Sequence, residues 1–338
     1  IINMFLFTLS TKLLHCLPSE LSHNIALKGL KVLYFLGLLR LLNVKFSTKG
    51  YLPERDIRNL SNKVGIAAGL DKNGDYIDCL AALGIDFIEV GTVTPKPQRG
   101  NLKPRIFRNK KQQSLLNRLG FNNKGVEHLL VQLKNKKSNI IVGTSIGKNF
   151  DTPNDKAFED YVLCLEKVYE FSDYIAVNIS SPNTKDLRDL SGTNFLNLLL
   201  QNIKLKQESL SKLYGYKPIL IKISPDEKYE ELKLICHSVL ENNLDGIICS
   251  NTTIDHESSY GPGGLSGAPL KDKATSCLVS IKNLVGDQLT IIASGGVMSV
   301  ADYREKIDAG ADHVQIYTGL IYEGPKLIQD IVNVDSLN

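Results

Sequence analysis

The sequence predicts a (β/α)8 barrel, or TIM barrel, preceded by a helical N-terminal extension that associates with a membrane. Two observations favour the barrel. After residue 60, short apolar runs alternate with longer segments of helical periodicity, and eight such pairs follow one another along the 338-residue chain. Glycine or a polar residue follows nearly every apolar run, as expected where barrel strands end at one rim. A doubly wound sheet is the alternative, because periodicity does not separate the two folds.

The extension comes first, at residues 1–45. Residues 1–50 hold six basic side chains against one acidic side chain, Glu20, although the net charge of the whole chain is only +4. Two short helices that are apolar and basic are predicted, one starting near Met4 and one over 26–42. The longest charge-free run of the second, 32–39, is far below the roughly 18 residues that cross a bilayer. These features fit a segment lying on an anionic membrane surface, and a helical hairpin packed on the main domain is the alternative.

A linker at 46–60 leads into the barrel domain at 61–338. The strands are predicted at 64–68, 87–90, 140–146, 174–179, 219–223, 246–249, 290–293 and 313–317. The helices are predicted near 75–83, 124–135, 155–170, 194–213, 228–242, 273–284, 300–309 and 325–332. Strands buried on both faces of a parallel barrel read as continuous apolar runs, whereas the helices that cover them show one apolar face.

Composition excludes several classes of protein. The chain is 43% hydrophobic and 22% charged, which is typical of a folded globular protein. Its six cysteines form no CxxC pair and indicate reduced thiols rather than a disulfide framework. The histidines form no HxH or HExxH pattern, so we expect no metal site. The positive excess lies wholly in the extension, so we expect no nucleic-acid partner.

The predicted rim carries amides, hydroxyls, glycines and two lysines, Lys72 and Lys222. This set suits a planar, hydrogen-bonding ligand with negative charge. Gly295-Gly296 and Thr318-Gly319 follow the last two strands, where barrels commonly bind phosphate through backbone N–H groups. Lys222 interrupts an apolar strand, so we expect it to meet an anionic partner at the rim; a Schiff-base role is the alternative.

Seven segments then carry a resemblance to a known family. They read AAGLDKNG (67–74), EVGTVTPKPQ (89–98), NRLGFNN (117–123), NISSPNT (178–184), SNTT (250–253), GGLSG (263–267) and VQIYTG (314–319). Together they resemble dihydroorotate dehydrogenases, in one order from about residue 62 to 332. The chain is more similar to the membrane-bound, quinone-using class 2, because Ser181 stands where class 1 enzymes have cysteine and because the extension is present.

The resemblance implies an FMN-dependent barrel that oxidises (S)-dihydroorotate to orotate in de novo pyrimidine biosynthesis, with a membrane quinone as electron acceptor. It implies that Ser181 is the general base, that Thr184 and Phe121 assist it, and that Lys222 acts electrostatically beside the flavin. The implied FMN contacts are Ala68, Thr92, Ser145, Asn178, Lys222, Ser250, Gly267, Gly296, Tyr317 and Thr318. The implied substrate contacts are Lys72, Asn117, Arg118, Leu119, Gly120, Phe121, Asn178, Asn183, Asn251 and Thr252. The implied quinone contacts are His23, Arg108 and Tyr317.

Two departures from the family pattern concern the flavin. Ser145 stands where the family usually has an asparagine that contacts the flavin, so that contact is lost or passes through water. Ser250 stands where many members have threonine. Because the extension lacks an arginine-rich leader, we expect a peripheral protein on the cytoplasmic face of a bacterial cell membrane. The alternatives are a class 1 enzyme using fumarate or NAD, a tRNA-dihydrouridine synthase and a non-enzymatic ligand-binding barrel.

Overall fold

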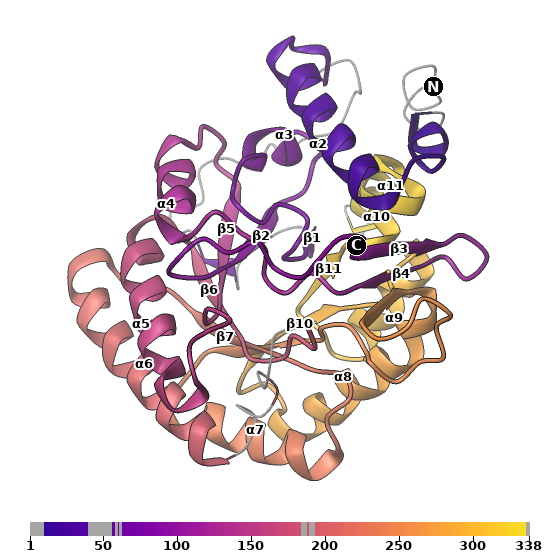
Figure 1. Ribbon diagram of the computed structural model, residues 1–338. Coiled ribbons are helices and arrows are strands. Elements are labelled where there is room, and N and C mark those ends of the chain that lie inside the picture. Colours follow the sequence, from indigo (N-terminus) through magenta and orange to yellow (C-terminus); the bar gives the residue numbers. More distant parts are fainter. Residues whose placement is uncertain are drawn as a thin grey trace.

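Eight parallel strands close into a barrel that is surrounded by helices (Figure 1). The computed structural model describes residues 10–39, 56–57, 60, 63–183, 188 and 193–335. Around the barrel the strands follow the order β1-β11-β10-β8-β7-β6-β5-β2. The prediction of a (β/α)8 barrel is therefore confirmed, and the doubly wound sheet is ruled out because β1 and β2, the first and last strands of this order, pair with each other and close the sheet.

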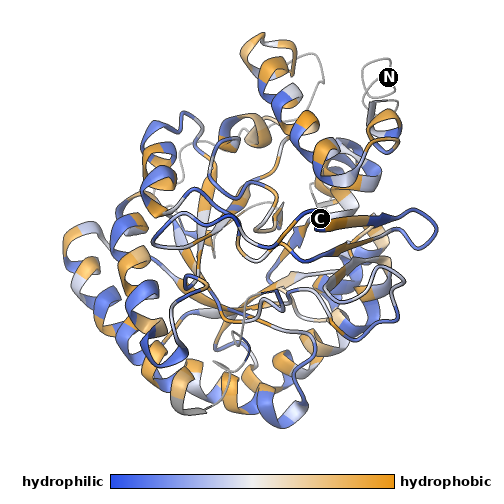
Figure 2. Ribbon diagram, viewed as in Figure 1, coloured by the Kyte–Doolittle hydropathy of each residue, from blue (hydrophilic) through white to orange (hydrophobic). Residues whose placement is uncertain are grey.

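The barrel strands lie close to the predicted apolar runs. Their bounds are β1 Val64–Ile66, β2 Phe87–Val93, β5 Ile141–Ile146, β6 Tyr174–Asn178, β7 Ile219–Ile223, β8 Gly246–Cys249, β10 Thr290–Ser294 and β11 His313–Ile316. Figure 2 shows these strands mainly in hydrophobic colours. Nearly every residue in them is buried, because helices cover the outer face and packed side chains fill the interior.

The covering helices are amphipathic. Their bounds are α3 Ile77–Ala81, α4 Val126–Asn135, α5 Ala157–Val168, α6 Thr193–Tyr214, α7 Tyr229–Glu241, α8 Lys271–Val285, α9 Val300–Asp308, α10 Thr318–Glu323 and α11 Pro325–Asp335. In α5 the buried side chains include Tyr161, Cys164, Leu165 and Val168, which share one helical face. The predicted helices are thus found, with differences of a few residues at their ends, and α10 is an additional short helix.

Large side chains fill the barrel interior at the amino-terminal ends of the strands. Phe87, Tyr174 and Ile57 belong to one buried cluster there. Two strand glycines make room for the rings: a Cβ on Gly143 would lie 1.9 Å from the Tyr174 ring, and a Cβ on Gly65 would lie 2.5 Å from the Phe87 ring. Among the described residues, the amino-terminal end of the barrel is therefore filled by side chains, and we expect a ligand at the carboxyl-terminal end.

A three-stranded antiparallel sheet beside the rim was not predicted. It comprises β3 Ile106–Asn109, β4 Ser114–Asn117 and β9 Gly264–Gly267, in the order β3-β4-β9. The Tyr322 hydroxyl of α10 donates to the backbone carbonyls of Asn109 and Ser114, both at 3.0 Å, and so ties the hairpin to the barrel. The sheet forms one wall of the space above the barrel.

The N-terminal segment contains α2 Ser19–Phe35, which packs beside α3 and β3 (Figure 1). The prediction of a helix over 26–42 was wrong at both ends: α2 starts at Ser19, and Gly37, with φ +70°, follows its C-terminus. Residues 10–14 are also helical. The Met4 end of the first predicted helix and the boundary at 45 fall on undescribed residues, and residues 61–62 after the boundary at 60 are undescribed as well, so all three stay predictions. Among the described helices, none has the length and hydropathy to cross a bilayer.

An ion pair holds α2 against the barrel. Glu20 Oε1 accepts from Arg105 Nη2 at 2.8 Å and from Arg105 Nε at 3.2 Å, and the Arg105 side chain is buried. Arg105 Nη1 also donates to the backbone carbonyls of Arg99 (2.6 Å) and Asn101 (3.2 Å). A guanidinium that is removed from water needs such a full set of acceptors. These bonds therefore fix the position of α2 against the barrel.

Candidate active site

The carboxyl ends of the barrel strands open into a cavity, here called the rim cavity. Almost all the residues assigned above to cofactor and substrate line it. They are Ala68, Lys72, Thr92, Asn117, Leu119, Gly120, Phe121, Asn178, Ser181, Asn183, Lys222, Ser250, Asn251, Thr252, Gly267, Gly296, Tyr317 and Thr318. Barrel geometry accounts for this convergence, because parallel strands of a closed barrel all end at the same rim.

Two residues assigned to the site do not line the rim cavity. Ser145 is fully buried, and its hydroxyl contacts the Thr92 hydroxyl at 2.9 Å, so it sits behind Thr92 as seen from the cavity. Arg118 Nη2 donates to the Tyr260 carbonyl at 2.6 Å, and its guanidinium lies 4.6 Å from the centre of the Phe107 ring. These contacts hold the Arg118 side chain away from the cavity. Thr184 lies outside the described residues.

Ser181 follows β6 in a buried turn. Its Oγ accepts a hydrogen bond from the backbone N–H of Asn183 at 3.3 Å. In the described part of the chain, no carboxylate or imidazole is hydrogen-bonded to this hydroxyl. A serine hydroxyl is a weak base, so any basicity here has to come from its position next to a bound ligand.

Asparagine amides surround the Ser181 turn. Asn183 Nδ2 donates to Asn117 Oδ1 at 3.0 Å. Asn251 Nδ2 donates to Ser180 Oγ at 3.1 Å and to Asn178 Oδ1 at 3.4 Å. Each amide has a donor end and an acceptor end, and these mutual bonds fix which end is available. The group is suited to a flat ligand with alternating N–H and C=O groups.

Lys72 places a cation on the cavity wall. Its Nζ donates to the Gly69 carbonyl at 2.7 Å. Burial, together with the charge of Arg105, lowers the pKa of Lys72 to about 8, so the ammonium is present at neutral pH. The preceding Asp71 is buried and accepts from the backbone N–H groups of Asp75 (3.0 Å) and Tyr76 (2.7 Å), which fixes the turn. The cavity therefore offers a positioned partner for a carboxylate.

Beneath the cavity, Lys222 meets a carboxylate inside the barrel. Lys222 Nζ lies 3.0 Å from Glu89 Oε1, and both side chains are buried. Gln315 Nε2 donates to Glu89 Oε2 at 2.7 Å, and the Tyr174 hydroxyl donates to the same oxygen at 3.3 Å. Glu89 and Gln315 were not predicted as site residues from the sequence. Each is the single acidic or amide residue of a mainly apolar strand, Glu89 in β2 and Gln315 in β11, and this pattern could have indicated them.

Two turns that line the rim cavity, one at Gly296 after β10 and one at Thr318 and Gly319 after β11, are here called the glycine cradle. Gly296 has φ +78°, and a Cβ added to it would lie 2.2 Å from the Lys271 Cα. Thr318 starts α10, and its hydroxyl lies 2.8 Å from the Ser266 hydroxyl. Exposed backbone N–H groups in such turns bind phosphate. At the barrel end of the same cavity, Gln315 Oε1 is buried and has no hydrogen-bond partner among the described residues. The cavity thus fits an elongated ligand with a phosphate tail and a polar flat ring.

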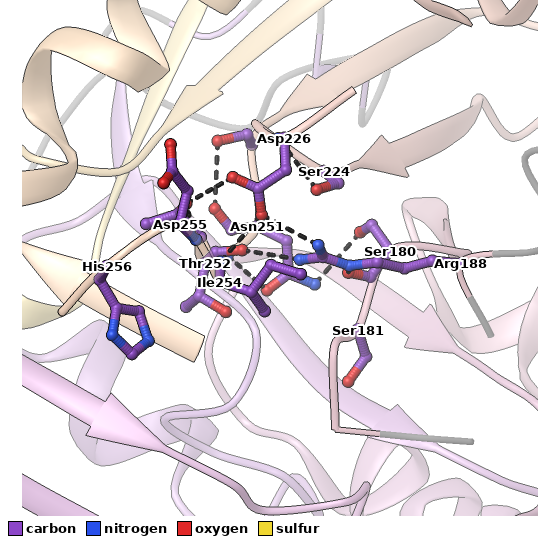
Figure 3. A network of polar contacts seen from close by, with 12 residues as sticks. Ser180, Ser181, Arg188, Ser224, Asp226, Asn251, Thr252, Ile254, Asp255 and His256 are labelled. Atoms are coloured by element: carbon purple, nitrogen blue, oxygen red, sulfur yellow. Dashed lines mark hydrogen bonds and ion pairs between the residues drawn. The ribbon is translucent and has the colours of Figure 1, made fainter. Parts of the chain in front are cut away.

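A second polar network joins the loops after β6, β7 and β8 (Figure 3). Asp226 lies between Arg188 Nη1 (2.9 Å) and Lys273 Nζ (2.8 Å), and it accepts from the Thr253 hydroxyl. Arg188 Nε donates to the Ser180 carbonyl at 3.2 Å. Burial opposes ionisation of the carboxyl, but its donors outweigh burial and lower the pKa of Asp226 to about 2. This network, here called the rim clamp, fixes the turn next to Ser181.

Another cavity lies between the N-terminal segment and the barrel and is here called the α2 cavity. His23, Arg108 and Tyr317 line it, as the sequence analysis expected of one site. Its other walls are mainly leucine and isoleucine side chains. Burial and the charge of Lys72 lower the pKa of His23 to about 3, so its imidazole is neutral at pH 7. Arg108 Nη1 donates to the His15 carbonyl at 3.1 Å.

The two cavities share a wall. Ile106 of β3, Leu115 of β4 and Tyr317 line both of them. Two of these residues belong to the unpredicted antiparallel sheet, so that sheet separates the cavities. A ligand in the rim cavity and a ligand in the α2 cavity would therefore both lie next to these three residues.

Comparison with known proteins gives consistent matches. A family model described as dihydroorotate dehydrogenase matches residues 57–334. The chain is 45% identical to "Dihydroorotate dehydrogenase (quinone)" of Vibrio parahaemolyticus over 94% of its own length and 96% of that protein. It is 44% identical to the protein of that name from Nitrosospira multiformis, over 97% and 95% of the two chains. A crystal structure of the Eimeria tenella enzyme DHODH in complex with ferulenol superposes with a TM-score of 0.82 at 34% identity, covering 93% of this chain and 89% of that one.

Proposed function

The chain belongs to the dihydroorotate dehydrogenase family of oxidoreductases, and from that premise we propose that it oxidises (S)-dihydroorotate to orotate with bound FMN and a membrane quinone as electron acceptor. One observation carries this proposal: Ser181, the asparagine amides and Lys72 line the same cavity as the glycine cradle. The class 2 reading is favoured over class 1 because the similar proteins are named as quinone enzymes. A tRNA-dihydrouridine synthase or a binding barrel is disfavoured by the family match.

The substrate would lie against the amides near Ser181. Orotate is a flat ring with alternating N–H and C=O groups, and Asn117, Asn183 and Asn251 supply both kinds of partner. Its carboxylate would pair with the Lys72 ammonium. The contact with the Lys72 charge would orient the ring, because the amides alone could bind it in more than one way.

Ser181 would remove the proton from C5 of dihydroorotate. A bound flavin supplies the acceptor for the hydride that leaves C6. The N–H of Asn183 already donates to Ser181 Oγ, which holds the hydroxyl in one position and leaves a lone pair and the proton of the hydroxyl for other partners. Phe121 would keep bulk water from the reacting edge, and Thr184 would help to carry the proton away.

FMN would span the cavity from the barrel centre to the cradle. Lys222 would face the ring and favour the negative charge that the ring gains on reduction. Gly296 and Thr318 would hold the phosphate. Ala68, Thr92, Asn178, Ser250, Gly267 and Tyr317 would contact the remainder, and Ser145 would act through Thr92.

The quinone would enter the α2 cavity, where His23, Arg108 and Tyr317 lie among apolar side chains. The side of α2 that does not line the α2 cavity supports docking on a membrane surface, since Val32 and Phe35 are exposed there together with Lys28. We propose peripheral association with the cytoplasmic face of a bacterial membrane, through residues 1–45.

An anaerobic half-reaction tests the proposal. Purified protein should be yellow, and dihydroorotate should bleach the flavin absorbance. Adding a ubiquinone analogue should restore it, whereas fumarate or NAD should not. A colourless protein, or reoxidation by fumarate alone, would refute the assignment.

A further inference from the structure

Glu89 is a buried carboxylate in the barrel interior. It lies in the middle of β2 with 0% exposure. Three donors surround it: Lys222 Nζ at 3.0 Å, Gln315 Nε2 at 2.7 Å and the Tyr174 hydroxyl at 3.3 Å. A carboxylate removed from water stays charged only with such partners. Glu89 itself does not line the rim cavity, but Lys222 and Gln315 do.

This arrangement changes the electrostatics of the cavity floor. Lys222 alone would place an uncompensated positive charge under a bound ring. With Glu89 at 3.0 Å, the buried pair has no net charge. Charges buried at this depth interact more strongly than in water, because little solvent screens them. The charge of Glu89 should therefore be felt by any group that gains or loses charge on top of Lys222.

We propose that Glu89 sets the reduction potential of the bound flavin by offsetting the charge of Lys222 and by fixing the Gln315 amide. The inference rests on the proposed function, because it requires a flavin in the rim cavity. Lys222 attracts the negative charge of the reduced ring, and Glu89 limits that attraction. The limit matters because a ring that holds its electrons too tightly reduces quinone slowly. Glu89 is thus a positioning residue that acts through Lys222 and Gln315.

The isosteric substitution Glu89→Gln removes the charge and keeps the volume. Gln315 can adapt, because its Oε1 has no partner among the described residues and a rotated amide could accept from the new side chain. The complementary substitution Lys222→Met removes the positive charge. Glu89 then keeps Gln315 and Tyr174 as hydrogen-bond donors. The double substitution removes both charges, so the pair again has no net charge, as in the wild type.

The test uses flavin-loaded full-length protein and reads two properties other than turnover. One is the midpoint potential from anaerobic dye equilibration. The other is the dissociation constant of sulfite, which adds to oxidised flavin and leaves a negative charge on the ring. Glu89→Gln should make the potential more positive and tighten sulfite about tenfold. Lys222→Met should change both in the opposite direction, and the double variant should return close to wild type. Tyr174→Phe, which removes a donor but no charge, should move both only slightly.

The opposite signs separate a charge effect from general damage. If Glu89→Gln retains FMN but changes neither property, or if both single variants shift in the same direction, the proposal is wrong. If Glu89→Gln does not fold, the midpoint potentials of Lys222→Met and of the double variant are compared instead. Equal potentials would overturn the proposal. A potential of the double variant that lies closer to the wild-type value would support it. Wild-type protein that carries no flavin would instead overturn the proposed function.

Discussion

The rim cavity and the α2 cavity share Ile106, Leu115 and Tyr317, yet their other walls have opposite chemistry. Asparagines, hydroxyls and two lysines line much of the rim cavity, and hydrogen bonds fix many of these groups. Leucine and isoleucine side chains line most of the α2 cavity, where burial keeps His23 neutral at pH 7. A polar substrate that must lose a proton needs positioned donors and acceptors, whereas a lipid-soluble acceptor needs an apolar surface. The comparison therefore predicts that substitutions in one cavity impair one half-reaction and spare the other.

Ser181→Ala should give the largest difference between its effects on the two half-reactions. Without the proposed base, bleaching of the flavin by dihydroorotate should slow by roughly 10²- to 10⁴-fold at neutral pH. FMN content and orotate affinity should change little, and chemically reduced enzyme should still pass electrons to quinone. Stopped-flow absorbance measures both half-reactions. Bleaching within threefold of wild type would remove Ser181 from the mechanism.

The rim clamp should matter for stability as well as for the rim cavity. Asp226→Asn leaves Arg188 and Lys273 without their shared carboxylate and should lower the free energy of unfolding by about 1–3 kcal/mol. Asp255→Asn is the matched control, since Asp255 pairs with the same Lys273 but its side chain is 80% exposed, against 14% for Asp226. Thermal and urea unfolding measure the difference. An equal decrease in the free energy of unfolding in the two variants would show that the rim clamp does not stabilise the fold more than an exposed ion pair does.

Protonation of Lys72 should control orotate binding. Because its pKa is lowered to about 8, the cation is present below that pH and is lost as the pH rises through it. The orotate dissociation constant should be constant near pH 7 and rise by up to about tenfold per pH unit above pH 8. Titration of flavin absorbance with orotate measures it. In Lys72→Met the binding should be weak and flat over this range, and a steep rise in that variant would assign the titration to another group.

A substitution in the α2 cavity should have a smaller effect, and this effect should fall on reoxidation of the flavin by quinone. His23→Ala should slow reoxidation by a quinone analogue by about fivefold, the cost of one lost contact of roughly 1 kcal/mol. Bleaching by dihydroorotate should be unchanged. Leu21→Ala is the control on the same helix, because Leu21 is exposed and does not line the α2 cavity. Slower bleaching in His23→Ala, with normal reoxidation, would contradict the division between the cavities.

The smallest effect should come from Ser145→Asn, which restores the residue that the family usually carries. Ser145 reaches the rim cavity only through the Thr92 hydroxyl, so FMN affinity and the KM for dihydroorotate should change by no more than about threefold. Fluorescence of released FMN measures the first quantity. A tenfold tighter FMN complex would mean that the asparagine reaches the flavin directly.

The barrel and most of its rim could be predicted from sequence because each signal is local. An apolar run followed by glycine or asparagine marks both a strand and its functional end. The sheet β3-β4-β9 could not be predicted in this way, since its strands have four residues each and Asn117 of β4 pairs with Gly264 of β9, far along the chain. The rim clamp also depends on long-range pairing. Glu89 was missed for a different reason: its partner Lys222 lies in another strand, and neither residue alone shows that the two meet.

The shared wall of Ile106, Leu115 and Tyr317 also has a consequence for inhibition kinetics. Under the proposed function, a compound that fills the α2 cavity would leave the rim cavity open, so it should compete with quinone and not with dihydroorotate. Electrons would then pass between the cavities at the residues that both cavities share, so the soluble reactant and the lipid-soluble one would never have to share a compartment.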